Sequence, residues 1–204
     1  MLNTQAWITI FKNIADAVEE SKDRLNALDG AIGDGDHGVG MSIGFRAIRE
    51  TVEKYTGNES LDQLFKQVGR VFLSAVGGAI GPLIGTMFMD SAKILSGCSS
   101  VGVVEFKQMM ETMENAVVRR GKTELGDKTL LDALHPAVMA VNESEKMSIV
   151  ELTKIAAESA EKGAKSTANM MSKRGRSSRL GERTIGHQDA GATRHFHPRN
   201  RHRS

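Results

Sequence analysis

The sequence predicts an all-α protein, and three observations carry that prediction. Apolar residues recur at intervals of three and four in nearly every segment, which is the spacing of one helix face. No segment shows the alternation of apolar and polar residues that is typical of a half-buried strand. Ser-x-x-Gln and Ser-x-x-Glu patterns begin at Ser60 and Ser148, as at many helix starts. We therefore expect about seven or eight helices and no strand.

The length and composition predict one domain. A chain of 204 residues, of which 40% are hydrophobic, can bury one sizeable core. We assign residues 1–193 to this helical domain. Residues 194–204 form an Arg- and His-rich end without a core-forming pattern, and we expect this basic tail to be disordered.

The first half of the chain supplies helical stripes on both sides of a glycine- and aspartate-rich stretch. The first stripe consists of Trp7, Phe11, Ile14 and Val18. A short helical stretch at 23–28 then leads into residues 28–40, and the next stripe consists of Met41, Phe45, Ile48 and Val52. The helix capped by Ser60 and Gln63 would bury Leu61, Leu64, Phe65, Val68, Phe72 and Ala75.

The second half continues the helical pattern as far as Met171. Residues 77–82, Gly-Gly-Ala-Ile-Gly-Pro, end one helix and begin another, because proline fits a first turn. The following stripes consist of Leu83, Met87, Ser91 and Leu95, then Phe106, Met109, Met110, Met113 and Val117, then Leu130, Leu134, Val138 and Val141, then Leu152, Ile155, Ala156 and Ser159. We expect a kink at Pro136. Residues 172–192 would form a long functional loop or a disordered segment.

The stretch from Leu28 to Gly40 holds the main candidate site. It contains Asp29, Asp34 and Asp36 among five glycines, without a lysine or arginine. Three carboxylates this close repel one another unless a cation lies between them. Oxygen ligands on a flexible backbone suit Mg²⁺, which keeps positions open for water or phosphate oxygens. The alternative is a turn-rich connection whose aspartates cap helices and whose glycines supply positive φ angles.

The composition indicates the cellular compartment of the protein and the classes of partner that it can bind. One cysteine, Cys98, fits a reducing compartment, and neither a signal peptide nor a membrane-spanning run is evident, so we predict a cytoplasmic protein without a membrane partner. The charge is uneven, with +7 on residues 172–204 and −5 before them. A basic end can contact nucleic acid, but a solvated tail is the commoner outcome, so no nucleic-acid partner is expected.

Four motifs in one order resemble one family. They are the aspartate stretch, residues 77–82, residues 121–129, and Arg-Thr-Ile-Gly-His-Gln-Asp-Ala-Gly-Ala-Thr at 183–193. Together they resemble the nucleotide-binding L subunit of dihydroxyacetone kinase, in its phosphotransferase-dependent type, over about residues 5–193. The resemblance implies an antiparallel barrel of about eight helices, with the nucleotide bound by the loops at one end.

The resemblance also implies a set of ligands. Two Mg²⁺ ions would be held by Asp29, Asp34 and Asp36 and would bridge the phosphates of a bound ADP. The implied ADP contacts are His37, Gly38, Val39, Gly40, Gly78, Ala79, Ile80, Gly121, Leu130, Arg176, Asp189, Ala190 and Gly191. His37 is expected to contact a phosphate rather than to carry one, and no side chain is assigned as catalytic.

The sequence departs from the family pattern at three places. Gly40 stands where the family commonly has asparagine, and Ile80 stands where it commonly has a serine beside the phosphates. After Thr193 the family continues into an apolar closing helix, whereas this chain continues into its Arg- and His-rich end.

The resemblance implies an enzyme subunit. A phosphoryl group would pass from a phosphohistidine-carrying M subunit of the phosphotransferase relay, through bound ADP, to dihydroxyacetone on a K subunit. Two alternatives stay open. One is a nucleotide-loaded, non-catalytic sensor that docks on a transcription regulator, and the other is an ATP-dependent kinase subunit.

Overall fold

The computed structural model describes residues 1–193 and confirms the all-α prediction. The described residues form seven α-helices and two 3₁₀ helices, and they contain no strand beyond an isolated bridge between Leu2 and Val101. The α-helices are α1 Thr4–Ile32, α2 His37–Val52, α3 Leu61–Ala75, α4 Ile80–Ile94, α5 Val103–Gly121, α6 Leu131–Glu143 and α7 Ile149–Ser166. The 3₁₀ helices are η1 Thr167–Asn169 and η2 Ser177–Thr184. The tail at 194–204, for which disorder was predicted, lies outside the described residues.

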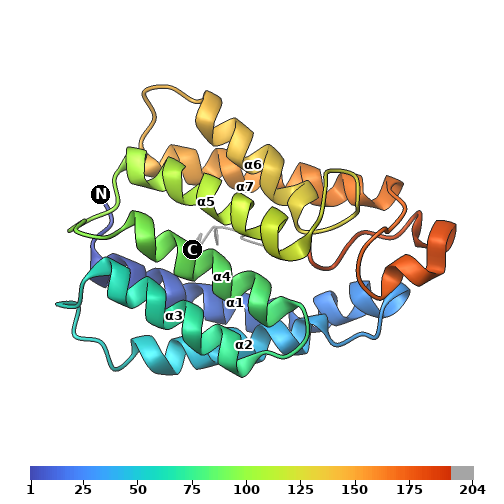
Figure 1. The fold of residues 1–204 in the computed structure, drawn as a ribbon, viewed down its shortest axis with the longest axis horizontal. Helices are drawn as coiled ribbons and strands as arrows, with labels where there is room; N and C mark the ends of the chain where they lie inside the picture. Colours follow the sequence, from blue (N-terminus) through green and yellow to red (C-terminus); the bar gives the residue numbers. More distant parts are fainter. Residues whose placement is uncertain (194–204) are drawn as a thin grey trace, which may run out of the picture.

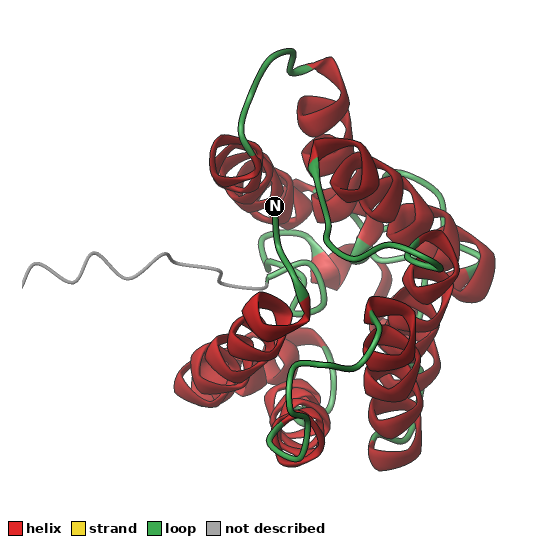
Figure 2. Cartoon of the chain, turned by 90° about the vertical axis from the view of Figure 1, so that its left-hand side faces the viewer, coloured by secondary structure: helices red, strands yellow, loops and turns green. Residues whose placement is uncertain are grey.

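Each α-helix packs against the next one along the chain, from α1 and α2 to α6 and α7. Figure 1 shows these helices lying side by side, and Figure 2 views them nearly end-on. Within residues 1–193, α1 and α7 are not among the pairs that pack extensively, so the closed barrel stays a prediction. No helix in the part of the chain that the structure describes is long and apolar enough to cross a membrane.

The buried faces are those that the apolar spacing predicts. The centre of the core is aromatic, because Phe11 contacts the rings of Trp7, Phe65 and Phe88 in tilted and edge-on arrangements. Met41 and Met109 are buried in the same core, which agrees with methionine as a flexible filler.

Close helix contacts depend on a few glycines. A Cβ atom on Gly163 of α7 would lie 2.3 Å from the carbonyl oxygen of Asp132 in α6, so only glycine fits there. Helix α6 contains Pro136 in its interior, at the position where the sequence predicts a kink. Of the two predicted capping boxes, the one at Ser148 is present, with Ser148 N donating to Glu151 at 2.8 Å. The one at Ser60 is wrong, because its side chain makes no capping bond.

The first helix is longer than predicted. The stretch at 23–28 continues α1 without a break, and the helical hydrogen bonds run on until Gly33 N donates to the Asp29 carbonyl. Asp29 therefore lies in the last helical turn, and the loop between α1 and α2 is only residues 33–36. This short loop fixes the three aspartates more tightly than a thirteen-residue loop would.

The segment after Met171 is ordered by one buried side chain. The ammonium group of Lys128, which is 2% exposed, donates to the carbonyl oxygens of Met170, Thr184 and His187. A second attachment joins Arg174 to the buried carboxylate of Asp127, with Nε 2.8 Å from Oδ2. Residues 170–189 are thereby held against the start of α6, at the same end of the molecule as the α1–α2 loop (Figure 1).

We predict that Lys128→Met destabilises the protein and loosens residues 170–189. The substitution leaves three carbonyl groups without their donor, and each unsatisfied buried group costs about 1–3 kcal/mol. Tryptic cleavage after Arg174, Arg176 and Arg179 should accelerate more than cleavage elsewhere in the chain. Lys122→Met, which removes an exposed lysine nearby, is the matched control. Equal tryptic patterns for the two variants would show that Lys128 does not hold this segment.

Candidate functional site

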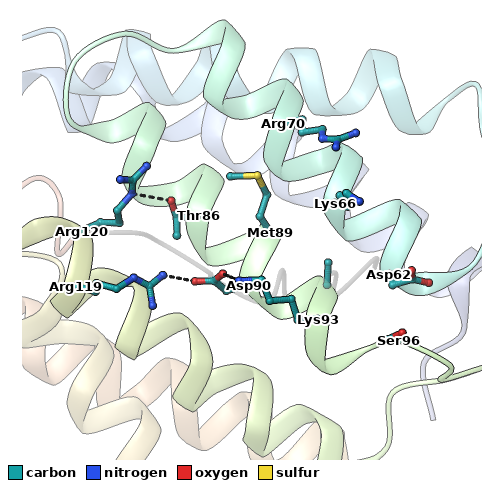
Figure 3. A pocket seen from close by; sticks show the side chains of 11 residues that line it. Asp62, Lys66, Arg70, Thr86, Met89, Asp90, Lys93, Ser96, Arg119 and Arg120 are labelled. Atoms are coloured by element: carbon teal, nitrogen blue, oxygen red, sulfur yellow. Dashed lines mark hydrogen bonds and ion pairs between the residues drawn. The ribbon is translucent and has the colours of Figure 1, made fainter.

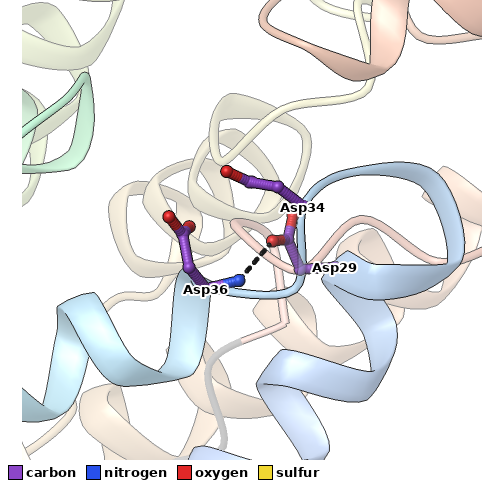
Figure 4. A group of neighbouring side chains, drawn as sticks. All are labelled: Asp29, Asp34 and Asp36. Atoms are coloured by element: carbon purple, nitrogen blue, oxygen red, sulfur yellow. Dashed lines mark hydrogen bonds between the residues drawn. The ribbon is translucent and has the colours of Figure 1, made fainter.

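The three predicted metal ligands lie together. Asp29 comes from the last turn of α1, Asp34 from the loop, and Asp36 from the position before α2. One carboxylate oxygen from each lies within 4.8 Å of the other two, and Figure 4 shows the three side chains around one point. Oxygen ligands at this spacing fit a hard divalent cation.

The loop backbone organises this cluster. Asp29 Oδ2 accepts a hydrogen bond from Gly35 N at 2.8 Å. It also accepts one from Asp36 N at 3.1 Å (Figure 4). Gly35 has a φ of 76°, a left-handed conformation in which glycine is favoured. The carboxylates of Asp34 and Asp36 are more exposed, and within residues 1–193 the Asp36 side chain makes no capping bond to α2. Asp29 therefore anchors the loop, and the other two face outward.

A cation from a distant part of the sequence lies on this cluster. The Arg176 guanidinium forms an ion pair with Asp34 and lies 3.8 Å from Asp36 Oδ2. Arg176 directly precedes η2, in the segment that Lys128 holds. The sequence predicts Arg176 as a phosphate contact; its pairing with the aspartates was not foreseen, since the loop itself lacks basic residues. The carboxylates of Asp34 and Asp36 therefore face a positive charge, and the metal site stays a prediction.

The first residues of α2 have different surroundings. Gly38 is buried, and a Cβ atom there would lie 2.1 Å from the Lys22 carbonyl oxygen, so glycine is needed for α1 and α2 to approach. Val39 N donates to the Asn26 side chain at 3.1 Å. Gly38 therefore permits the close approach of α1 and α2, and the backbone of Val39 joins the two helices by a hydrogen bond.

Gly40 and Ile80 are neighbours in space. A Cβ atom on Gly40 would lie 3.7 Å from Ile80 Cδ1 and 3.7 Å from Val76 Cγ1. Ile80 is the first residue of α4, so the two departures from the family pattern meet where α2 and α4 approach each other. The two departures therefore lie at one place in the structure.

The glycine-rich turn before α4 combines open space with one tight contact. A Cβ atom on Gly77 or Gly78 would meet nothing within 4 Å, and Gly78 has a φ of 68°. A Cβ atom on Gly81, by contrast, would lie 1.9 Å from the Val76 carbonyl oxygen. The turn therefore leaves its backbone accessible at Gly77, Gly78 and Ala79, as contact with a phosphate would require.

Asp189 and Gly191 lie beside the aspartate loop. A Cβ atom on Gly191 would lie 3.9 Å from His37 Cε1, which places the two predicted contacts together. Asp189 Oδ2 accepts a hydrogen bond from Ala192 N at 2.7 Å. Burial raises the pKa of Asp189 to about 6, with smaller raising effects of the Asp132 and Asp29 charges, while the Ala192 bond and Lys128 oppose the rise. Ala190 between them is buried.

Gly121 and Leu130 occupy positions at the ends of helices. Gly121 is the last residue of α5, and a Cβ atom there would lie 3.7 Å from Leu83 Cδ1. Leu130 precedes α6 and belongs to the hydrophobic core, with 9% exposure. For these two residues the structure shows packing contacts rather than a shared contact with the aspartates.

Sequence reasoning missed the residues that support the site. Asp132 accepts from Gly126 N at 2.6 Å and from Thr129 N at 2.8 Å, which fixes the turn that carries Lys128. Thr167 Oγ1 accepts from Asp189 N at 2.9 Å. The mixed charges and glycine of residues 122–129 were the available signal, because a loop rarely buries charge without a partner.

Comparisons with known proteins show which family the chain belongs to. The DAK2 domain matches residues 31–196. The chain is 38% identical over 185 residues to the "PEP-dependent dihydroxyacetone kinase 2, ADP-binding subunit DhaL" of Listeria innocua, covering 90% of this chain and 86% of that protein. It is also 38% identical over 189 residues to the corresponding Escherichia coli subunit, covering 92% and 88%.

Solved structures support the same fold. The native dihydroxyacetone kinase of C. freundii matches with a TM-score of 0.72 and 24% identity over 94% of this chain. The match spans about a third of that longer chain, 33%. The chain therefore belongs to the DAK2 domain family, together with the L-type subunits of dihydroxyacetone kinases.

Proposed function

We propose that this chain is the ADP-binding subunit of a dihydroxyacetone kinase that depends on the phosphotransferase relay. The observation that carries the proposal is the Asp29, Asp34 and Asp36 cluster, which faces an arginine and lies beside a glycine-bearing segment. Relatives named as PEP-dependent or PTS-dependent ADP-binding subunits, at up to 38% identity over most of the chain, support the substrate class.

Different residues of this chain would bind different parts of the metal–nucleotide ligand at this site. The three carboxylates would hold two Mg²⁺ ions, which neutralise phosphate charge when bound. Arg176 would move from Asp34 to a phosphate oxygen, because a metal ion takes its place on the carboxylate. Backbone amides at Gly78 and Ala79 would approach the phosphates from the α4 side. His37, with Asp189 to Gly191, would close the opposite side of the nucleotide.

The phosphoryl group would arrive from a phosphohistidine-carrying M subunit and leave to dihydroxyacetone on a K subunit. Phosphoryl transfer depends mainly on positioning and charge neutralisation, so the site needs no covalent side-chain anchor. This account fits a site whose polar groups are carboxylates, one guanidinium and backbone amides. We place the protein in the cytoplasm, where a relay of soluble phosphohistidine proteins operates.

The contact between Gly40 and Ile80 favours a second candidate function. The sec-butyl side chain of Ile80, beside the turn at residues 77–81, offers no hydroxyl, so transition-state stabilisation would rest on fewer donors. A copy that binds nucleotide but turns over poorly could act as a sensor that docks on a transcription regulator. The donor experiment below separates the two.

We predict that Asp36→Asn sharply weakens Mg²⁺-dependent ADP binding and leaves the fold intact. The Asp36 side chain is 67% exposed and makes no capping bond to α2, so the fold does not depend on it. Removing one of three like charges should keep the metal-free stability level or raise it slightly. Calorimetric titration of ADP with Mg²⁺ measures the affinity, and Asp23→Asn on the exposed side of α1 is the matched control. Unchanged ADP affinity would remove Asp36 from the ligand set.

The partly buried Asp189 carboxyl gives a pH-dependent prediction. Its pKa is raised to about 6 in the folded protein, above the ordinary value of 3.8, so ionisation destabilises the fold as the pH rises through this range. Asp189→Asn does not ionise, so its stability relative to the original protein should improve by about 1 kcal/mol between about pH 5 and about pH 7.5. Urea unfolding in EDTA measures the difference. A difference that stays constant with pH would show that Asp189 keeps an ordinary pKa.

The phosphoryl donor tests the proposed function directly. With K and M subunits and the relay proteins, dihydroxyacetone phosphorylation should require phosphoenolpyruvate, and substoichiometric ADP should suffice because ADP stays bound. Millimolar ATP without the relay should support no sustained turnover. Multiple turnovers on ATP alone would favour the ATP-dependent alternative, whereas bound ADP without turnover on either donor would favour the sensor.

A further inference from the structure

A second charged site lies away from the aspartate loop, along helix α4. A cavity of about 540 Å³ is formed where α3 and α5 flank this helix, and Figure 3 shows its lining side chains. Five of the lining residues are basic and two are acidic. We call this cavity the α4 groove. Its volume is in the range of small-molecule sites.

The basic side chains of the groove outnumber the acidic ones. Asp90 shares its single negative charge between Lys93 and Arg119, and Asp62 supplies the second negative charge among the lining residues. In the described part of the chain, no carboxylate pairs with Lys66, Arg70 or Arg120. Arg120 donates only to the Thr86 hydroxyl, at 3.1 Å, so its charge stays uncompensated. The groove therefore carries excess positive charge.

The arrangement of these cations selects the kind of anion. Lys66 and Arg70 project from α3, and Arg120 projects from α5 on the other side of α4 (Figure 3). A ligand that contacts both sides must span the width of α4, roughly 10 Å. One phosphate group is too small to do so. Arginine side chains recognise phosphate oxygens in a planar, bidentate manner.

The floor of the groove is apolar. Met89 and Ala92 of α4 lie between the basic side chains. Met89 reaches over Gly69 of α3, where a Cβ atom would lie only 2.6 Å from Met89 Cγ, so the close α3–α4 approach fixes its position. A carbon chain between two phosphate groups would rest on this floor.

We propose that the α4 groove binds a small organic bisphosphate, with one phosphoryl group held by Lys66 and Arg70 and the other by Arg120. This site is separate from the proposed ADP site and does not depend on it. The groove nevertheless touches the same framework, because α4 begins at the Gly77–Gly81 turn and Arg120 precedes Gly121.

The test is a calorimetric titration with fructose 1,6-bisphosphate in EDTA, on the full chain. EDTA removes divalent ions, so the aspartate loop repels anions. We expect binding to the original protein, and binding of fructose 6-phosphate about tenfold weaker. The triple variant K66Q/R70Q/R120Q should lose about tenfold or more in affinity for the bisphosphate. Circular dichroism verifies its fold, and the single variants Arg70→Gln and Arg120→Gln, each a few-fold weaker, replace it if it does not fold.

Two controls make the outcome decisive. K12Q/K54Q/K154Q removes the same charge from basic residues outside the groove, and Arg176→Gln removes the cation at the aspartate loop. Both should keep the affinity within about twofold. Absence of binding at millimolar bisphosphate would overturn the proposal. So would equal losses in the two triple variants, which would show general charge attraction, or a selective loss in Arg176→Gln, which would place the anion at the aspartate loop.

Discussion

The candidate site depends on the hydrogen bonds that the buried Lys128 ammonium group donates to the C-terminal segment. Burying a lysine is costly unless its donors are satisfied, and here three backbone carbonyl groups satisfy them. Those carbonyls belong to Met170, Thr184 and His187, which are far apart within the C-terminal segment. One side chain therefore fixes both ends of the segment that delivers Arg176 and Asp189 to the aspartate loop.

Charge at the site is divided between two parts of the chain. The carboxylates come from the α1–α2 junction, and the guanidinium that balances them comes from the segment that Lys128 holds. Repulsion among the carboxylates favours a bound cation, whether that cation is Arg176 or a metal ion. We therefore expect docking of the C-terminal segment to be coupled to cation binding at the aspartate cluster. Arg176 lowers the negative charge that a metal ion would meet, and a bound metal ion would lower the negative charge that attracts Arg176.

The sequence predicted what depends on local pattern and missed what depends on distant contacts. Helix faces and the aspartate cluster were predictable, because their residues are close in sequence. The end of α1 was misplaced, since Asp29-Gly30 is typical of a turn, yet the helical hydrogen bonds continue to Gly33. The order of residues 172–193 has no periodic signal, because Lys128 imposes it from outside the segment.

Gly40 and Ile80 lie close together beside the glycine-rich turn before α4. The family resemblance leads us to expect asparagine at one position and serine at the other, and both of these residues are polar. Here a Cβ atom on Gly40 would lie 3.7 Å from Ile80 Cδ1, an ordinary van der Waals distance, so the two positions are neighbours in space. Helices α2 and α4 pack against each other here, and Gly40 and Ile80 supply no polar side-chain group at that place. In the proposed function, phosphate recognition would therefore rest on backbone amides, on Arg176 and on bound cations, so the ordering of the C-terminal segment that carries Arg176 would be important for nucleotide binding.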